Sequence, residues 1–153
     1  MSPHQATRIT LLFVEAFVAV TAFAGGIALM LGALIPDLSS VITPPAEYLE
    51  GSPFQSYLVP GLVLATVLGG VHAIAFVLLL RRRPSALFAA AAAGYAALIW
   101  IFVQMMVIPF SFLQAAYFIA GAVELGLVML DLGLLPVARA TNRRPTRSNV
   151  PAS

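Results

Sequence analysis

The chain has 153 residues, of which 61% are hydrophobic and 9% are charged, and its formal net charge is +2. Soluble domains carry about 25% charged residues, so a chain this apolar cannot cover itself with a polar surface and must be solvated by lipid. The sequence contains no cysteine, which excludes disulfides, thiolate metal ligands and thiol nucleophiles. Its length allows one small domain.

Four apolar segments are long enough to cross a bilayer, since a spanning helix needs about 20 apolar residues. The first begins like a secretory signal peptide, but its apolar run continues through Ile35 and contains Glu15, so we interpret it as a retained helix. We therefore predict an all-α integral membrane protein, a single domain over residues 1–136 that forms an up-down four-helix transmembrane bundle. The four segments are 9–35, 53–80, 85–108 and 112–136.

A loop of residues 36–52 joins the first and second segments on the outer side. Thr43, which precedes two prolines, suits the start of a helix, and Gly51 suits its left-handed end, so we predict a short outer-loop helix. Two interpretations stay open for this loop. It is either a lid that covers the outer end of the bundle or a gate for a ligand.

Serine and proline mark other helix boundaries. Ser52 and Pro53 suit the N-cap and the first turn of the second segment, and Pro60 then falls in its second turn, where a bend is expected. Ser111 and Gln114 have the spacing of a capping box at the start of the fourth segment.

All eight basic residues are arginine, and they flank one side of the predicted membrane. The opposite side has no arginine and contains Asp37, Glu47 and Glu50. The positive-inside rule therefore predicts that both termini are cytoplasmic. The arginines are Arg8, Arg81, Arg82, Arg83, Arg139, Arg143, Arg144 and Arg147.

The arginine clusters need no nucleic acid to explain them. Arg81, Arg82 and Arg83 suit the head groups of anionic lipids, which we predict as partners together with the lipid bilayer itself. Residues 137–153 are polar and contain prolines, so we predict a flexible basic tail on the cytoplasmic side.

Four ionisable residues interrupt the apolar segments: Glu15, His72, Glu124 and Asp131. A charged side chain at membrane depth costs roughly 2.5–3.5 kcal/mol on insertion scales, so it is usually paired, buried in the bundle or functional. Small residues share the helix faces of Glu15 and His72, which predicts that both side chains face neighbouring helices.

The depth of each ionisable residue in the membrane follows from the number of residues to the nearest arginine, at a helical rise of 1.5 Å per residue. On this count Glu15, Asp131 and His72 lie roughly 10, 12 and 14 Å inside the membrane, and Glu124 lies roughly 22 Å inside. The first and fourth helices of an up-down bundle are normally neighbours. We therefore predict that Glu15 meets Asp131, with His72 opposite and Glu124 one layer farther out.

Two carboxylates that lie close together in a low-dielectric site must share a proton, pair with a protonated histidine or bind a cation. The alternative is that these polar groups only lock the helices together, and it stays open. The predicted residues of a ligand, proton or cation site are Glu15, His72, Glu124, Asp131, Tyr117 and Gln104.

Evidence for a metal or a cofactor is weak in the sequence. Glu15, His72 and Asp131 offer suitable ligand types, but no local motif such as Glu-x-x-His supports them. Nothing resembles a phosphate loop, a nucleophile elbow or a haem-binding pair. We predict no metal, no cofactor and no catalytic residue.

The outer loop and the spans carry a set of short motifs. They are Leu49-Glu50-Gly51-Ser52-Pro53-Phe54, Tyr57-Leu58-Val59-Pro60-Gly61-Leu62, Gly69-Gly70, Trp100 with Gln104, and Phe112-Leu113-Gln114 before Tyr117-Phe118 and Glu124. In these motifs the chain resembles a functionally uncharacterised family of small four-pass bacterial membrane proteins. The resemblance implies the fold and a membrane location, and it implies no activity. We predict that the protein lies in the bacterial cytoplasmic (inner) membrane.

Two functions stay open. The first is a non-enzymatic protein that acts by binding, either as an accessory subunit of a membrane assembly or as a lipid- or ligand-binding module, with another membrane protein or a second copy as partner. It is favoured by small-residue faces such as Gly61, Ala65 and Gly69. The alternative is a proton- or cation-coupled small transporter that uses Glu15 and Glu124. An intramembrane enzyme is a third hypothesis.

Overall fold

The structure is a computed structural model that describes residues 3–134. The predicted tail of residues 137–153, with its four arginines, and the last residues of the predicted fourth span lie outside the described part. The elements are α1 (Pro3–Leu34), α2 (Pro36–Ile42), the 3-10 helix η1 (Ala46–Leu49), α3 (Leu58–Val63), the π-helical segment η2 (Leu64–Gly69), α4 (Gly70–Leu80), α5 (Ala86–Val107) and α6 (Phe112–Asp131).

Four helices in the described part are long and apolar enough to cross a membrane, and α3, η2 and α4 together make the second of them. The shortest, α6, has 20 residues, which at 1.5 Å per residue is about 30 Å, the thickness of the hydrocarbon core. The prediction of four apolar helices in a membrane bundle is therefore confirmed. These features indicate a multi-pass membrane protein.

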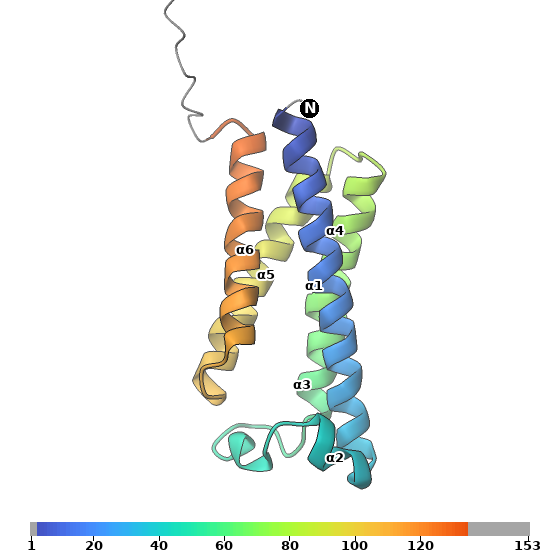
Figure 1. Ribbon diagram of the computed structural model, residues 1–153, viewed down its shortest axis with the longest axis vertical. Helices are drawn as coiled ribbons and strands as arrows, with labels where there is room; N and C mark the ends of the chain where they lie inside the picture. The colour runs from blue at the N-terminus through green and yellow to red at the C-terminus, as the bar shows by residue number, and fades with distance from the viewer. Residues whose placement is uncertain (1–2, 135–153) are drawn as a thin grey trace, which may run out of the picture.

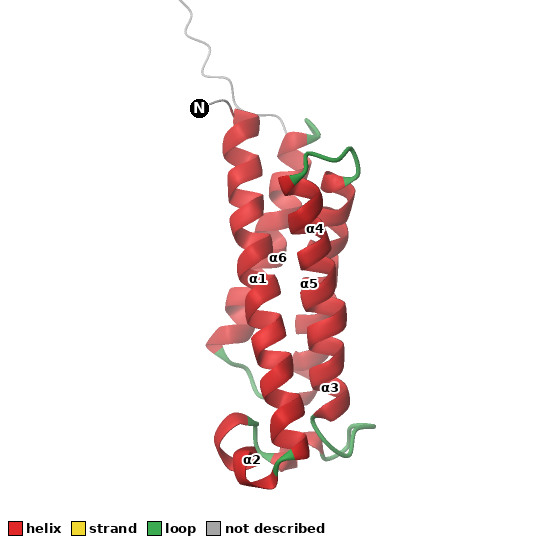
Figure 2. Cartoon of the chain, turned by 90° about the vertical axis from the view of Figure 1, so that its right-hand side faces the viewer, coloured by secondary structure: helices red, strands yellow, loops and turns green. Residues whose placement is uncertain are grey.

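The four spans lie side by side and alternate in direction (Figures 1 and 2). The start of α1 and the end of α6 consequently lie at the same end of the bundle, where His4 on α1 contacts Asp131 on α6. This end also carries the loop with Arg81 to Arg83, and Arg8 donates to the carbonyl oxygens of Leu79 and Leu80 at the end of α4. We call it the arginine end.

The second span begins later than predicted. Its helix starts at Leu58, not near Pro53, so that Pro60 lies in the first turn and not in the second. Proline is tolerated in a first turn because the amide there has no intrahelical partner, whereas in a helix interior it removes a hydrogen bond and clashes with the preceding turn. Pro60 thus favours a start at Leu58. Ser52 instead closes a turn, in which its hydroxyl accepts from the Phe54 amide.

The outer loop contains one helix that the sequence analysis missed, α2. Thr43 does not cap a following helix, because its hydroxyl donates to the Ser39 carbonyl at 2.6 Å, and the segment after it forms only the short η1. Gly51 has a φ of +80°, as a left-handed turn requires. The Tyr57 hydroxyl donates to the Pro45 carbonyl at 2.8 Å and holds this loop against the start of the second span.

The predicted capping box of Ser111 and Gln114 is confirmed.

The side chains on the outside of the bundle are large and apolar. Phe13, Phe88, Phe102 and Met106 are each at least two-thirds exposed. The interior, in contrast, is rich in alanine and glycine. This distribution is typical of helices in lipid, where large side chains face acyl chains and small ones allow helices to approach.

Two glycine pairs bring helix backbones into contact. A Cβ atom added to Gly26 of α1 would lie 2.6 Å from the carbonyl oxygen of Gly61 in α3, and one added to Gly61 would lie 2.8 Å from the carbonyl oxygen of Gly26. On the other side of the bundle, a Cβ atom on Gly94 of α5 would lie 3.1 Å from the carbonyl oxygen of Gly121 in α6. The contact between α1 and α3 therefore leaves no room for a methyl group, and the contact between α5 and α6 leaves little.

We predict that Gly26→Ala destabilises the protein by about 1–3 kcal/mol, because the added methyl group forces α1 and α3 apart. The matched control is Gly126→Ala, since a Cβ atom there meets nothing within 4 Å. It is expected to leave stability unchanged or raise it by up to about 1 kcal/mol. Thermal unfolding in detergent micelles measures both, and equal midpoints for the two variants would contradict the close packing.

Candidate functional site

Three ionisable side chains from three spans meet inside the bundle. They are Glu15 of α1, His72 of α4 and Glu124 of α6, and none of them has any solvent-exposed surface. One ligand atom from each lies within 4.8 Å of the other two. We call this group the buried polar centre.

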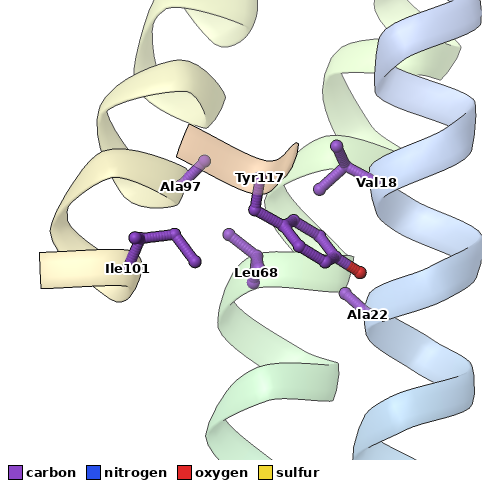
Figure 3. Close-up of a cluster of buried hydrophobic side chains, with 6 residues drawn as sticks. All are labelled: Val18, Ala22, Leu68, Ala97, Ile101 and Tyr117. Carbon is purple, nitrogen blue, oxygen red and sulfur yellow. The ribbon is translucent and has the colours of Figure 1, made fainter. Parts of the chain in front are cut away.

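Each span holds its polar side chain between apolar residues on the same buried face. On the side away from the arginine end lies a cluster formed by Val18, Ala22, Leu68, Ala97, Ile101 and Tyr117 (Figure 3). Toward the arginine end lies a second cluster formed by Leu11, Leu79, Ala86, Ala90 and Val128. On α1, for example, Glu15 falls one turn from Leu11 and one turn from Val18. The buried polar centre is therefore a polar layer between two apolar layers.

The orientation of the His72 ring is set by its own helix. Its Nδ1 lies 2.7 Å from the Leu68 carbonyl oxygen, which can only accept, so Nδ1 carries a proton and donates it. Leu68 belongs to the π-helical segment η2, and π-helical turns occur frequently at functional sites. The remaining nitrogen, Nε2, faces the carboxylates and lies 3.4 Å from Glu124 Oε2.

The groups at the centre lack hydrogen-bond partners. Among the described residues, both carboxyl oxygens of Glu15, both of Glu124 and Nε2 of His72 are buried without a hydrogen bond. The contact between Nε2 and Glu124 is close enough for an ion pair but is not aligned as a hydrogen bond. Because burial of an unpaired charge is costly, these groups require a proton, an imidazolium or a cation to balance them.

The predicted contact between Glu15 and Asp131 is wrong. Glu124 takes that place, on a level with Glu15 and His72 and not one layer farther out. The physical reason is that α6 ends at Asp131, whereas the predicted helix continued to residue 136 and thus put Asp131 deeper in the bundle. Asp131 Oδ1 instead lies 2.7 Å from Nδ1 of the exposed His4 and accepts a hydrogen bond from it.

Asp131 and His4 line a cavity of about 550 Å³ at the arginine end, together with Arg8, Arg82 and Arg83. Leu11 and Leu79 also line this cavity. Both belong to the apolar cluster that lies between the buried polar centre and the arginine end. A single apolar layer therefore separates the cavity from the centre.

Tyr117 and Gln104 lie outside the centre. Tyr117 packs in the apolar cluster on the side away from the arginine end, where its hydroxyl points to α1 (Figure 3) and donates to Thr21 Oγ1 at 2.6 Å. Thr21 in turn donates to the Phe17 carbonyl oxygen at 2.7 Å. Gln104 is half-buried on α5, one turn beyond Ile101 of the same cluster. The structure thus brings together three of the six predicted site residues, and their role stays a prediction.

Sequence reasoning missed two residues near the site. Thr21 was not singled out because a lone threonine in an apolar helix usually satisfies its own backbone. His4 lies before the predicted first span of residues 9–35, but α1 begins at Pro3 and includes it. No signal in the sequence pointed to the contact of His4 with Asp131, which are 127 residues apart.

Comparisons with known proteins add no identity. No family model, no curated protein and no solved structure matches the chain. The family resemblance of the outer-loop motif therefore stays a prediction.

We predict that the hydrogen bond between Tyr117 and Thr21 holds α6 against α1 beside the centre. Tyr117→Phe and Thr21→Val are each expected to cost about 0.6 kcal/mol, and at most about 1.7 kcal/mol, as interhelical hydrogen bonds in membranes do. A double-mutant cycle of unfolding in micelles should show that the two costs are not additive. Tyr95→Phe is the control, because Tyr95 is 56% exposed; strict additivity of the first pair would rule the coupling out.

Proposed function

We propose that the protein binds a cation at the buried polar centre and couples this binding to the movement of an ion or a small solute across the membrane. The observation that supports the proposal is the convergence of Glu15, His72 and Glu124, all fully buried and without hydrogen-bond partners among the described residues. Ionisable groups that face the interior of a membrane bundle commonly mark ion pathways or proton relays.

A purely structural role accounts less well for this arrangement. Polar groups that lock helices together satisfy one another with hydrogen bonds, as Tyr117 and Thr21 do. The carboxyl groups of Glu15 and Glu124 make no such bond. The negative charge of these carboxylates is then balanced by a cation that binds as a ligand.

The layered surroundings favour a transported ligand over a resident one. An apolar cluster lies on either side of the centre, so the structure corresponds to a closed site. Only the layer of Leu11 and Leu79 separates this site from the cavity at the arginine end. Displacement of that layer would connect the centre to one side of the membrane, which is the step that a coupled transporter requires.

The hypothesis of an accessory subunit, or of a lipid-binding module, stays a prediction without a specific contact in its favour. It depended on small-residue faces that could receive a partner helix. Gly26 and Gly61 pack against each other within the chain, and Phe23 covers Gly69. These faces are therefore occupied by the protein's own helices.

The proposed location is the bacterial cytoplasmic membrane with the arginine end inside. The support is the separation of charge along the bundle, with Arg8 and Arg81 to Arg83 at one end and Asp37, Glu47 and Glu50 in the opposite loop. Both termini would then be cytoplasmic, and Arg81 to Arg83 would lie at the level of anionic lipid head groups.

Flux into proteoliposomes tests the proposal. We expect the reconstituted protein to conduct a cation along its gradient, read by pH-sensitive and metal-sensitive dyes trapped inside the vesicles. Glu15→Gln and Glu124→Gln should each lower the initial rate at least about tenfold, because each removes a charge that binds the cation. Glu47→Gln, the same change in an exposed loop residue, should leave the rate unchanged.

Two results would contradict the proposal. One is flux by the unmodified protein that does not exceed that of empty vesicles with either dye. The other is an equal rate for Glu15→Gln and Glu47→Gln, which would show that the buried carboxyl groups take no part.

A further inference from the structure

We infer that the cation is a divalent transition metal ion of the Zn²⁺ type, bound by Nε2 of His72 and by one carboxylate oxygen each from Glu15 and Glu124. The inference rests on the proposed cation-binding function and assigns the chemical class of the ligand. These three residues hold five buried atoms without hydrogen bonds, and one ligand atom from each residue lies within 4.8 Å of the other two.

The donor set selects the ion. One imidazole nitrogen with two carboxylate oxygens suits Zn²⁺ and its neighbours in the first transition row. Ca²⁺ takes six to eight oxygen ligands, and Mg²⁺ requires six in an octahedron. Gln114 is the one other buried polar residue in the described part of the chain, and it is engaged in the cap of α6. The centre therefore lacks the oxygens that these harder ions need.

Charge leads to the same choice. Two carboxylates and a neutral imidazole carry two negative charges, which one divalent ion balances. A monovalent ion would leave a net negative charge between two apolar layers, where an unbalanced charge is costly.

The distances fit an ion in the centre. Two ligands that bind Zn²⁺ at about 2.0–2.1 Å in a tetrahedron are about 3.3 Å apart. His72 Nε2 and Glu124 Oε2 are 3.4 Å apart, so this pair already has the spacing. The third donor, a carboxylate oxygen of Glu15, lies within 4.8 Å of a ligand atom on each of the other two residues and needs a shift on the order of 1 Å.

The histidine ring is held as metal ligands are held. A histidine that binds a metal almost always donates its other ring N–H to a carbonyl or a carboxylate, which fixes the tautomer and aims the free nitrogen at the ion. The Leu68 carbonyl does this for His72, and the other ring nitrogen, Nε2, lies 3.4 Å from Glu124 Oε2. This observation is independent of the carboxylate cluster.

Three protein ligands leave one tetrahedral position open, as in zinc sites that exchange a ligand and unlike closed structural sites with four protein ligands. An open position suits an ion that has to enter and leave. The inference therefore agrees with a site through which the ion passes.

Metal binding by the full-length protein in detergent micelles tests the inference. The protein is stripped with a chelator, equilibrated with Zn²⁺ alone, and analysed by elemental analysis, chelator competition and X-ray absorption. We expect one Zn²⁺ per chain, with nitrogen and oxygen ligands at about 2.0–2.1 Å and the scattering signature of imidazole. Glu15→Gln, Glu124→Gln and His72→Gln should each weaken binding at least about tenfold.

The controls separate the centre from a surface site. His4 and Asp131 form an exposed pair that could itself hold Zn²⁺, so the double variant His4→Ala/Asp131→Asn should keep the bound ion, as should Glu47→Gln. Loss of the ion in that double variant, or its retention at full affinity in all three variants of the centre, would overturn the inference. Failure of the folded protein to bind Zn²⁺ would do the same.

Two measurements keep the test decisive if a variant does not fold. X-ray absorption of the unmodified protein needs no substitution, and a spectrum without imidazole excludes His72. In addition, Zn²⁺ should raise the unfolding temperature of the unmodified protein, and the same Zn²⁺ concentration should raise that of Glu15→Gln less, since stabilisation grows with the ratio of the ion concentration to the dissociation constant.

The two proposals fail in different ways. Zn²⁺ bound at the centre without flux in proteoliposomes would refute coupled transport and leave the metal site standing. Flux that depends on Glu15, in a protein that binds no Zn²⁺, would refute the metal site and leave a different cation, such as a proton, as the ligand.

Discussion

The balance of charge in the buried polar centre constrains the rest of the structure. Glu15 and Glu124 face each other and His72 in a space with no exposed surface, and their oxygens accept no hydrogen bond from the described residues. Water stabilises such groups outside the membrane, whereas here apolar layers lie on both sides of them. The helices that carry the three side chains must therefore be held in one register, because a shift by one turn would place a carboxylate among apolar side chains.

Backbone packing supplies that register. Gly26 against Gly61 brings α1 and α3 so close that a methyl group would force them apart, and Gly94 against Gly121 brings α5 and α6 into a contact with little room for one. Contacts of this kind resist sliding of one helix along the other, since the ridges of one helix fit the grooves of the next. The hydrogen bond from Tyr117 to Thr21 adds a directional link between α6 and α1 close to the centre. The polar layer thus sits in a frame built from small residues, while the large apolar side chains are left to face lipid.

The arrangement suits a site that is occupied and emptied in turn. In a structural salt bridge the two charged groups bond to each other. In the centre, an imidazole whose orientation is fixed by Leu68 and two carboxylates without hydrogen-bond partners are left to bind a ligand. The cavity at the arginine end lies beyond the layer of Leu11 and Leu79, and a layer of that thickness can be displaced by small helix movements. Cation binding, and the proposed choice of a divalent metal ion, both follow from the same requirement that the buried charges be neutralised.

The sequence by itself determined the class of the protein, the number of spans, the capping box of α6 and the likeness in depth of Glu15 and His72. Hydrophobic length and helix-cap chemistry are local properties, so they can be read from consecutive residues. It placed the start of the second span too early, and it paired Glu15 with Asp131, because both depended on how far a helix extends. Only the tertiary structure decided that Glu124 completes the centre and that Asp131 turns to His4 at the arginine end. Those choices depend on the axial offset between helices, which is set by packing between residues far apart in the chain and leaves no trace in any one segment.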